Sequence, residues 1–203
     1  MSTRSSSAAS LLDPSTARGL WLRWLPTFVA FIVGGAVAIA VTGPVTSLTA
    51  ALGGGALAGA VLGAGQWLAL RGRLSKTEWW IPATAIGQAV GLAAGAALVG
   101  YRTGLQDLAI QGAITGVGVG ILQALVLRPH VATWFWWALA MPPLWALGWI
   151  VTMLGGIRVD QHFTNFGAYG AITFAVVSGL LLVQLLRAPR PIDEVTRPAV
   201  AAA

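Results

Sequence analysis

The sequence predicts an all-α, polytopic membrane protein whose six transmembrane helices form three pseudo-symmetric helical hairpins. Apolar residues make up 57% of the 203-residue chain and charged residues only 9%, whereas ordinary soluble domains carry about 25% charged residues. The apolar residues gather in six stretches, each close to the roughly 20 residues that a helix needs to cross a bilayer. Basic residues cluster at the ends of these stretches, where topology signals are found.

The six stretches are the predicted membrane spans, and 19–187 is the predicted transmembrane domain. Apart from Asp107 at a helix end, the stretches contain no charged residue and no histidine. The serine-rich residues 1–18 and the proline- and alanine-rich residues 188–203 are expected to be disordered tails. The predicted spans are Trp24–Gly43, Ser47–Leu70, Trp79–Gly100, Asp107–Leu127, Trp134–Leu154 and Thr164–Leu186.

Basic residues are divided unequally between the two sides of the predicted bundle. Ten of the twelve lie on the side that holds both termini, and only Arg102 and Arg158 lie on the other side. Because Lys and Arg accumulate in cytoplasmic loops, both termini are predicted to be cytoplasmic. The first span also has a basic start and an Ala38-Ile39-Ala40 sequence that is similar to a signal-peptide cleavage site. A retained helix is favoured because this span fits the repeat described next.

Two segments of the chain repeat one another at an offset of 57 residues. Gly55–Gly91 aligns without gaps on Gly112–Gly148, with thirteen of 37 positions identical, which indicates a duplicated helical hairpin. Each copy has a glycine-rich helix, a glutamine, an arginine, a short turn and a tryptophan pair. A third copy with fewer matches is expected to be split between the last and first spans, because Trp24 aligns on Trp80 at an offset of 56.

Glycines recur every four residues on three of the predicted helices. Residues four apart share one helix face, and glycine there lets two backbones approach closely, which drives helix association where lipid is as apolar as leucine. We expect these ridges to pack helices together inside the bundle, and the alternative is that one ridge faces outward and forms a dimer. The ridge glycines are Gly55, Gly59, Gly63, Gly87, Gly91, Gly95, Gly112, Gly116 and Gly120.

Gln66 and Gln123 occupy the same position in the two hairpins. Each follows the last ridge glycine of its helix by three residues, which places the amide beside the ridge on the packed side of the helix. Two roles are open for this pair of residues. They form either a clamp of interhelical hydrogen bonds or the polar lining of a cavity on the pseudo-symmetry axis.

No ionisable side chain is expected deep in the bilayer, which disfavours ion-coupled transport, voltage sensing and buried acid–base catalysis. The chain lacks cysteine and contains no catalytic or phosphate-binding motif, so we predict no catalytic residue, no metal site and no cofactor. Polar residues of the outer loops are expected to form an external patch, with merely solvated loop ends as the alternative. The patch residues are Arg102, Asp107, Arg158, Asp160 and His162.

Eight of the ten tryptophans lie near the predicted cytoplasmic boundary of the membrane. We interpret them as an interfacial anchoring belt, and the alternative is a stacking surface for a flat apolar ligand. These residues are Trp21, Trp24, Trp67, Trp79, Trp80, Trp134, Trp136 and Trp137.

The segment Gly59–Arg71, followed by the pair Trp79-Trp80, has the pattern GxxxGxxQWLxLR…WW. This pattern resembles a repeat found in bacterial multi-pass membrane proteins of unknown function. The second copy departs from it at Ala124, which replaces the tryptophan of the Gln-Trp pair. The resemblance implies a helical fold in the bacterial cytoplasmic membrane and carries no activity or functional residue with it.

The expected function is a non-enzymatic one, in which the protein packs with a partner or organises its surroundings in the membrane. The first alternative is an uncoupled carrier or channel for a neutral or lipidic solute, and the second is an enzyme acting on a lipid-soluble substrate at the outer patch. The expected partners are the lipid bilayer and either another membrane protein or further copies of the chain. Nucleic acid is not expected, because the basic residues mark topology.

Overall fold

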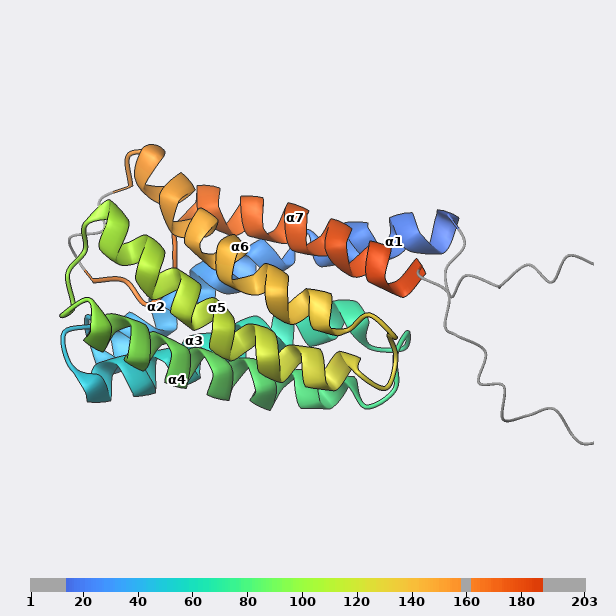
Figure 1. Cartoon of the computed structure of the whole chain (residues 1–203), viewed down its shortest axis with the longest axis horizontal. Helices are drawn as coiled ribbons and strands as arrows, with labels where there is room; N and C mark the ends of the chain where they lie inside the picture. Colours follow the sequence, from blue (N-terminus) through green and yellow to red (C-terminus); the bar gives the residue numbers. More distant parts are fainter. Residues whose placement is uncertain (1–13, 158–161, 188–203) are drawn as a thin grey trace, which may run out of the picture.

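The computed structural model describes residues 14–157 and 162–187, and this part of the chain is an all-helical bundle with the character of an integral membrane protein (Figure 1). The described residues contain no strand. Six helices are long and apolar enough to cross a membrane, as predicted. The elements are α1 (Pro14–Trp24), α2 (Thr27–Thr42), α3 (Leu48–Leu70), the 3₁₀ turn η1 (Thr77–Trp79), α4 (Trp80–Leu98), α5 (Leu105–Leu127), α6 (Phe135–Leu154) and α7 (Ala168–Arg187).

The first span consists of two helices with a break between them. α1 and α2 together form the span Thr16–Thr42, and the break falls at Pro26, whose ring removes a backbone N–H from the helical pattern. Because α1 begins at Pro14, the last residues of the expected N-terminal tail are helical. The rest of that tail, 1–13, and the expected C-terminal tail, 188–203, lie outside the described residues.

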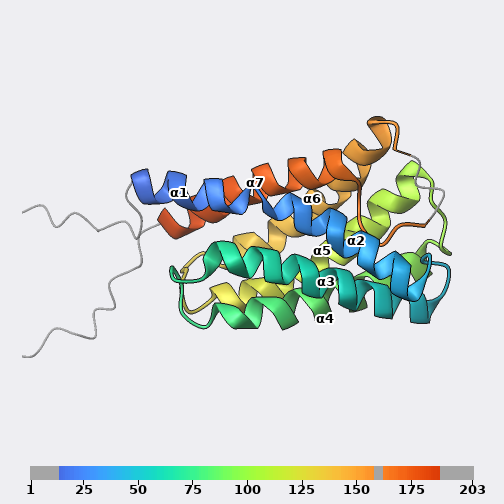
Figure 2. The ribbon, with the colours of Figure 1, turned by 180° about the vertical axis from the view of Figure 1, so that it is seen from behind.

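Successive helices pack side by side and close into a ring (Figures 1 and 2). Helices α2 to α6 contact their neighbours along the chain, and α7 closes the ring by contacting α1 and α2 as well as α6. The α3–α4 and α5–α6 turns lie at the same end of the bundle as α1 and the end of α7 (Figure 1). We call this end the basic end, because it carries Arg18, Arg23, Arg71, Arg73, Lys76, Arg128 and Arg187.

The sixth span starts later than predicted, because residues 162–167 are not helical. α7 begins at Ala168, four residues after the predicted start at Thr164. The segment 162–167 instead enters the bundle, where Thr164, Asn165 and Phe166 are at most 5% exposed. Its side chains contact α2, α4 and α6. A short non-helical segment therefore takes the place of the expected first turn of the last helix.

The ridge glycines lie against the backbone or side chains of a neighbouring helix in the same chain. A Cβ atom placed on Gly59 would lie 2.7 Å from the carbonyl oxygen of Thr84, and one on Gly91 would lie 2.7 Å from the Cα atom of Thr115. Side-chain rotation cannot relieve contacts this close to backbone atoms. The α3 ridge faces α4, the α4 ridge faces α5 and the α5 ridge faces α6, so these glycines bring consecutive helices together.

The interpretation of the tryptophans as an interfacial belt is wrong for Trp24, Trp80 and Trp137, whose exposed fraction is 0%. Their neighbours Trp79 and Trp136 are 61% and 53% exposed. Adjacent residues on a helix point about 100° apart. In each tryptophan pair, the first residue therefore lies on the outer surface and the second lies in the interior. Membrane anchoring fits the exposed member of each pair, whereas the buried member belongs to the core.

Candidate functional site

The two predicted glutamines meet in the interior of the bundle. Gln66 on α3 and Gln123 on α5 are 0% and 1% exposed, and Gln123 Nε2 donates a hydrogen bond of 2.9 Å to Gln66 Oε1. The same nitrogen donates a second hydrogen bond of 2.8 Å to the hydroxyl of Thr84 on α4. One amide group therefore joins three consecutive helices, which is the geometry of an interhelical clamp.

Two buried tryptophans complete the hydrogen bonding of the glutamine oxygens. Trp80 Nε1 donates to Gln66 Oε1 at 2.7 Å, and Trp137 Nε1 donates to Gln123 Oε1 at 3.0 Å. In each hairpin the tryptophan follows its glutamine by 14 residues. The two hydrogen bonds therefore join equivalent positions of the repeat, 57 residues apart in the sequence. An indole N–H paired with an amide oxygen can be buried without leaving the donor unsatisfied.

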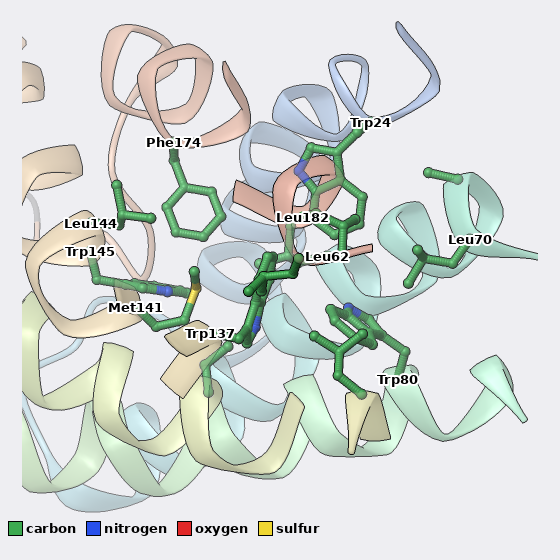
Figure 3. Close-up of a cluster of buried hydrophobic side chains, with 14 of the residues drawn as sticks. Trp24, Leu62, Leu70, Trp80, Trp137, Met141, Leu144, Trp145, Phe174 and Leu182 are labelled. Carbon is green, nitrogen blue, oxygen red and sulfur yellow. The ribbon is translucent and has the colours of Figure 1, made fainter. Parts of the chain in front are cut away.

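Trp24 provides a third indole beside the other two (Figure 3). Its Nε1 donates a hydrogen bond of 3.0 Å to the hydroxyl of Ser178 on α7. The ring centroids of Trp24, Trp80 and Trp137 lie 5.8, 6.0 and 6.2 Å apart in edge-to-face contacts, an arrangement that aromatic rings prefer. We call these three residues the tryptophan triad, and it fills the bundle interior near the glutamines.

A second group of aromatic rings fills the bundle next to the triad. Phe31 stacks on Phe166 with a centroid separation of 4.6 Å, and both pack against Trp145 and Phe174. All four side chains are at most 1% exposed. Figure 3 shows Trp145 and Phe174 beside the triad. Together, the two groups fill the interior beside Gln66 and Gln123, where a cavity with a polar lining is one of the two expected arrangements.

Asn165 and Gln88 form a second buried polar contact, which the sequence analysis did not predict. Asn165 Oδ1 accepts a hydrogen bond from Gln88 Nε2, and Asn165 Nδ2 donates one of 3.1 Å to the carbonyl oxygen of Phe31. The sequence predicts instead that Asn165, at the edge of the last predicted span, belongs to a polar outer loop. The available signal was its position between two phenylalanines, Phe163 and Phe166, which is unusual for a solvated loop.

Two buried amide atoms of this polar core have no hydrogen-bond partner among the described residues. They are Gln66 Nε2 and Gln88 Oε1. A buried donor or acceptor without a partner costs about 1–3 kcal/mol, so a water or a small polar solute that paired with either atom would be held there. The polar core can thus donate and accept hydrogen bonds, and it contains no ionisable side chain.

The structure brings together only part of the expected outer patch. Arg102 Nη2 lies 2.9 Å from Asp107 Oδ1, in an ion pair whose arginine side chain is 67% exposed. Arg158 and Asp160 lie outside the described residues, and His162 uses its backbone carbonyl to accept a hydrogen bond from the N–H of Val45. An exposed ion pair of this kind contributes about 0–1 kcal/mol to stability, as expected for solvated loop ends.

Across residues 14–157 and 162–187, no three His, Asp or Glu side chains come together in a group that could hold a metal ion. The site that the structure assembles is therefore the polar core of Gln66, Gln123, Thr84 and Gln88 with Asn165, enclosed by aromatic rings. Comparisons of this chain with protein-family models, curated proteins and solved structures found no match.

Proposed function

We propose that this chain is a non-enzymatic protein of the bacterial cytoplasmic membrane that acts by packing against a partner membrane protein or a second copy of itself. Both termini are proposed to lie in the cytoplasm. The GxxxGxxQWLxLR…WW pattern further suggests membership of a group of bacterial multi-pass membrane proteins of unknown function. One observation carries the functional proposal, namely that the centre of the bundle is filled by side chains bonded to one another.

The filled interior supports a packing role because it leaves little room for a solute. The oxygens of Gln66 and Gln123 accept hydrogen bonds from Trp80 and Trp137, and Gln123 Nε2 donates one to Gln66 Oε1. A path lined by these glutamines would require breaking those bonds and displacing two indole rings. What the protein offers to other molecules in the membrane is its outer surface, where apolar side chains such as Val90 are exposed.

A carrier for a small neutral solute is the second candidate, and the unpaired atoms Gln66 Nε2 and Gln88 Oε1 favour it. A hydroxyl or amide group of a solute could pair with these atoms. Solute passage would then require the tryptophan triad to separate, because it lies beside Gln66 and Gln123.

Solute flux in proteoliposomes distinguishes the two candidates. The purified full chain is reconstituted, and the permeability of the vesicles to water, glycerol and urea is measured by stopped-flow light scattering. We expect permeabilities equal to those of protein-free vesicles, and no change with Gln66→Leu combined with Gln123→Leu. A solute flux that depends on the protein and is altered by these substitutions would support the carrier and overturn the packing role.

Site-specific photo-crosslinking in native membranes tests the packing role directly. A photoreactive residue is placed at Val90 on α4, Leu139 on α6 or Ile172 on α7, which are 57%, 60% and 44% exposed. We expect a discrete crosslinked species from one of these faces. A photoreactive residue at Leu62, which is fully buried, provides the control. The absence of a discrete product from every outward face would argue against packing with a protein partner.

A further inference from the structure

An open cleft lies at the basic end of the bundle, between the α1–α2 break and the end of α3, two elements that Figure 2 shows side by side. Its volume is about 540 Å³. One part of its wall is apolar and another part carries two arginines and a threonine. We call it the basic cleft, and it is lined by Leu22, Arg23, Pro26, Thr27, Gly65, Leu68, Ala69 and Arg71.

The arginines of the basic cleft are available to an anion. Arg23 and Arg71 are both exposed, and the only ion pair among the described residues joins Arg102 to Asp107 at the opposite end of the bundle. The guanidinium carbon of Arg71 lies 5.6 Å from the ring centroid of Trp67, a cation–π contact that restrains the arginine beside the cleft. Two arginines that have no carboxylate partner among residues 14–157 and 162–187 thus face one opening.

A third group in the same wall is a buried hydroxyl that lacks a partner. Thr27 is 3% exposed, and its Oγ1 makes no hydrogen bond to any described residue. Thr27 is also the first residue of the 16-residue helix α2, whose N-terminus has no side-chain cap. The N–H groups of Phe28 and Val29 at this end already donate to the carbonyl oxygens of Leu25 and Pro26, so the Thr27 hydroxyl is the donor that this helix end offers to a ligand. The hydroxyl and the arginines therefore favour the same kind of ligand.

We propose that the basic cleft binds the phosphate headgroup of an anionic phospholipid. Basic residues at the ends of membrane spans lie at the level of lipid headgroups. Arg23 and Arg71 would hold the phosphate, Thr27 would donate to it, and the exposed side chains of Leu22 and Leu68 would contact the start of an acyl chain. A lipid, rather than free phosphate, fits because most of the lining residues are apolar. This site is independent of the function proposed above.

The chain contains a matched cleft that lacks these features. At the offset of 56 residues, the positions of Arg23, Pro26 and Thr27 correspond to Trp79, Pro82 and Ala83. At the offset of 57 residues, the position of Gly65 corresponds to Leu122. Trp79, Pro82, Ala83 and Leu122 all line a cleft of about 350 Å³ between α4 and α5, and Lys76 lines it too. This second cleft offers one lysine, no arginine and no hydroxyl, so we expect it to select a phosphate headgroup more weakly than the basic cleft does.

Native mass spectrometry of the detergent-solubilised full chain tests the proposal. The protein is titrated with an equimolar mixture of phosphatidylglycerol and phosphatidylcholine, and the ratio of the two bound lipids is measured. We expect the parent to prefer phosphatidylglycerol and Arg23→Gln with Arg71→Gln to lower that preference about tenfold. Thr27→Val should lower it about threefold, because it removes a hydrogen bond and little volume.

The matched control removes two charges from the other side of the basic end. Arg128 aligns on Arg71 at the offset of 57 and lies 5.9 Å from the ring of Trp134, and Lys76 borders the second cleft. Arg128→Gln with Lys76→Gln should change the lipid preference less than twofold. An equal loss in this control, or no preference in the parent, would overturn the proposal. So would thermal stabilisation by inorganic phosphate alone that requires Arg23 and Arg71, if phosphatidylglycerol gave none.

Discussion

The indole–amide bond is the smallest unit from which this interior is built. Trp80 and Trp137 bring large apolar rings into the bundle, and each ring has one N–H that requires an acceptor in the absence of water. Gln66 and Gln123 supply that acceptor, and the remaining donors of Gln123 link α3 and α4. Each tryptophan thus depends on a glutamine 14 residues before it.

Gln123→Leu should destabilise the protein by about 2 kcal/mol, because it leaves the Trp137 N–H without a hydrogen-bond acceptor and removes the hydrogen bonds to Gln66 and Thr84. Trp137→Phe removes that unsatisfied donor. The double variant, Gln123→Leu with Trp137→Phe, should therefore lose less stability than the sum of the losses in the two single variants. Thermal unfolding in detergent measures all three. Trp136→Phe, at a 53% exposed position, should be nearly neutral. Strict additivity would show that the indole–amide bond contributes nothing.

At the scale of the helix, glycine sets how closely neighbours approach. Gly59 lies against Thr84 and Ala85 of α4, and Gly116 lies against Met141 and Pro142 of α6. Because lipid competes for apolar surface, the contact between backbones carries the association in place of the hydrophobic effect. The ridge glycines are therefore needed for the close packing of consecutive helices, and they do not indicate flexible helices.

Gly59→Ala should destabilise the bundle although it adds a single carbon atom. That atom would lie 2.7 Å from the Thr84 carbonyl oxygen and 2.8 Å from the Ala85 Cα, so the two helices would have to separate, at a cost of about 1–3 kcal/mol. Ala94→Leu, on the exposed face of α4, adds three carbon atoms and should have little effect. Thermal unfolding in detergent compares the two. Equal stability would mean that α3 and α4 tolerate separation.

The non-helical segment 162–167 packs inside the bundle and is held there by the polar side chain of Asn165. Asn165→Leu should lower stability by about 2 kcal/mol, because it leaves the buried Gln88 amide without its partner. Adding Gln88→Leu should recover part of that loss, since replacing both polar partners by apolar groups removes the unsatisfied one. Chemical unfolding in detergent gives the three values. A double variant less stable than Asn165→Leu alone would contradict this account.

At the scale of the whole molecule, the orientation of the bundle follows from its charges. The basic end carries seven Lys or Arg side chains among the described residues, so it should face the cytoplasm. Reporter fusions after Ser75 and at the C-terminus should read as internal, and fusions after Gly104 and Gly156 as external. A C-terminus that reads as external would reverse the proposed topology.

The number and order of the spans could be predicted because they depend only on the lengths of apolar runs. The burial of Trp80 beside the exposed Trp79 could not, because it depends on the rotation of α4 about its axis, which tertiary packing decides. The recurring spacing of 14 residues between glutamine and tryptophan was the missed signal. Asn165 was missed because its partners, Gln88 and Phe31, lie 77 and 134 residues away, beyond the reach of any local pattern.

The closure of the ring by α7 imposes an order on biogenesis. Ser178, the partner of Trp24, lies 154 residues after it, and ribosomes add about 5–20 residues per second. The indole of Trp24 therefore waits roughly 8 to 30 s in the lipid or in the insertion machinery before its acceptor is synthesised. In a nascent chain that stops after α6, the ring is open, because the helix faces that α7 contacts have no packing partner. We call this gap between α6 and α2 the seam. That seam leaves in contact with lipid the faces of α1, α2 and α6 that α7 covers in the finished molecule.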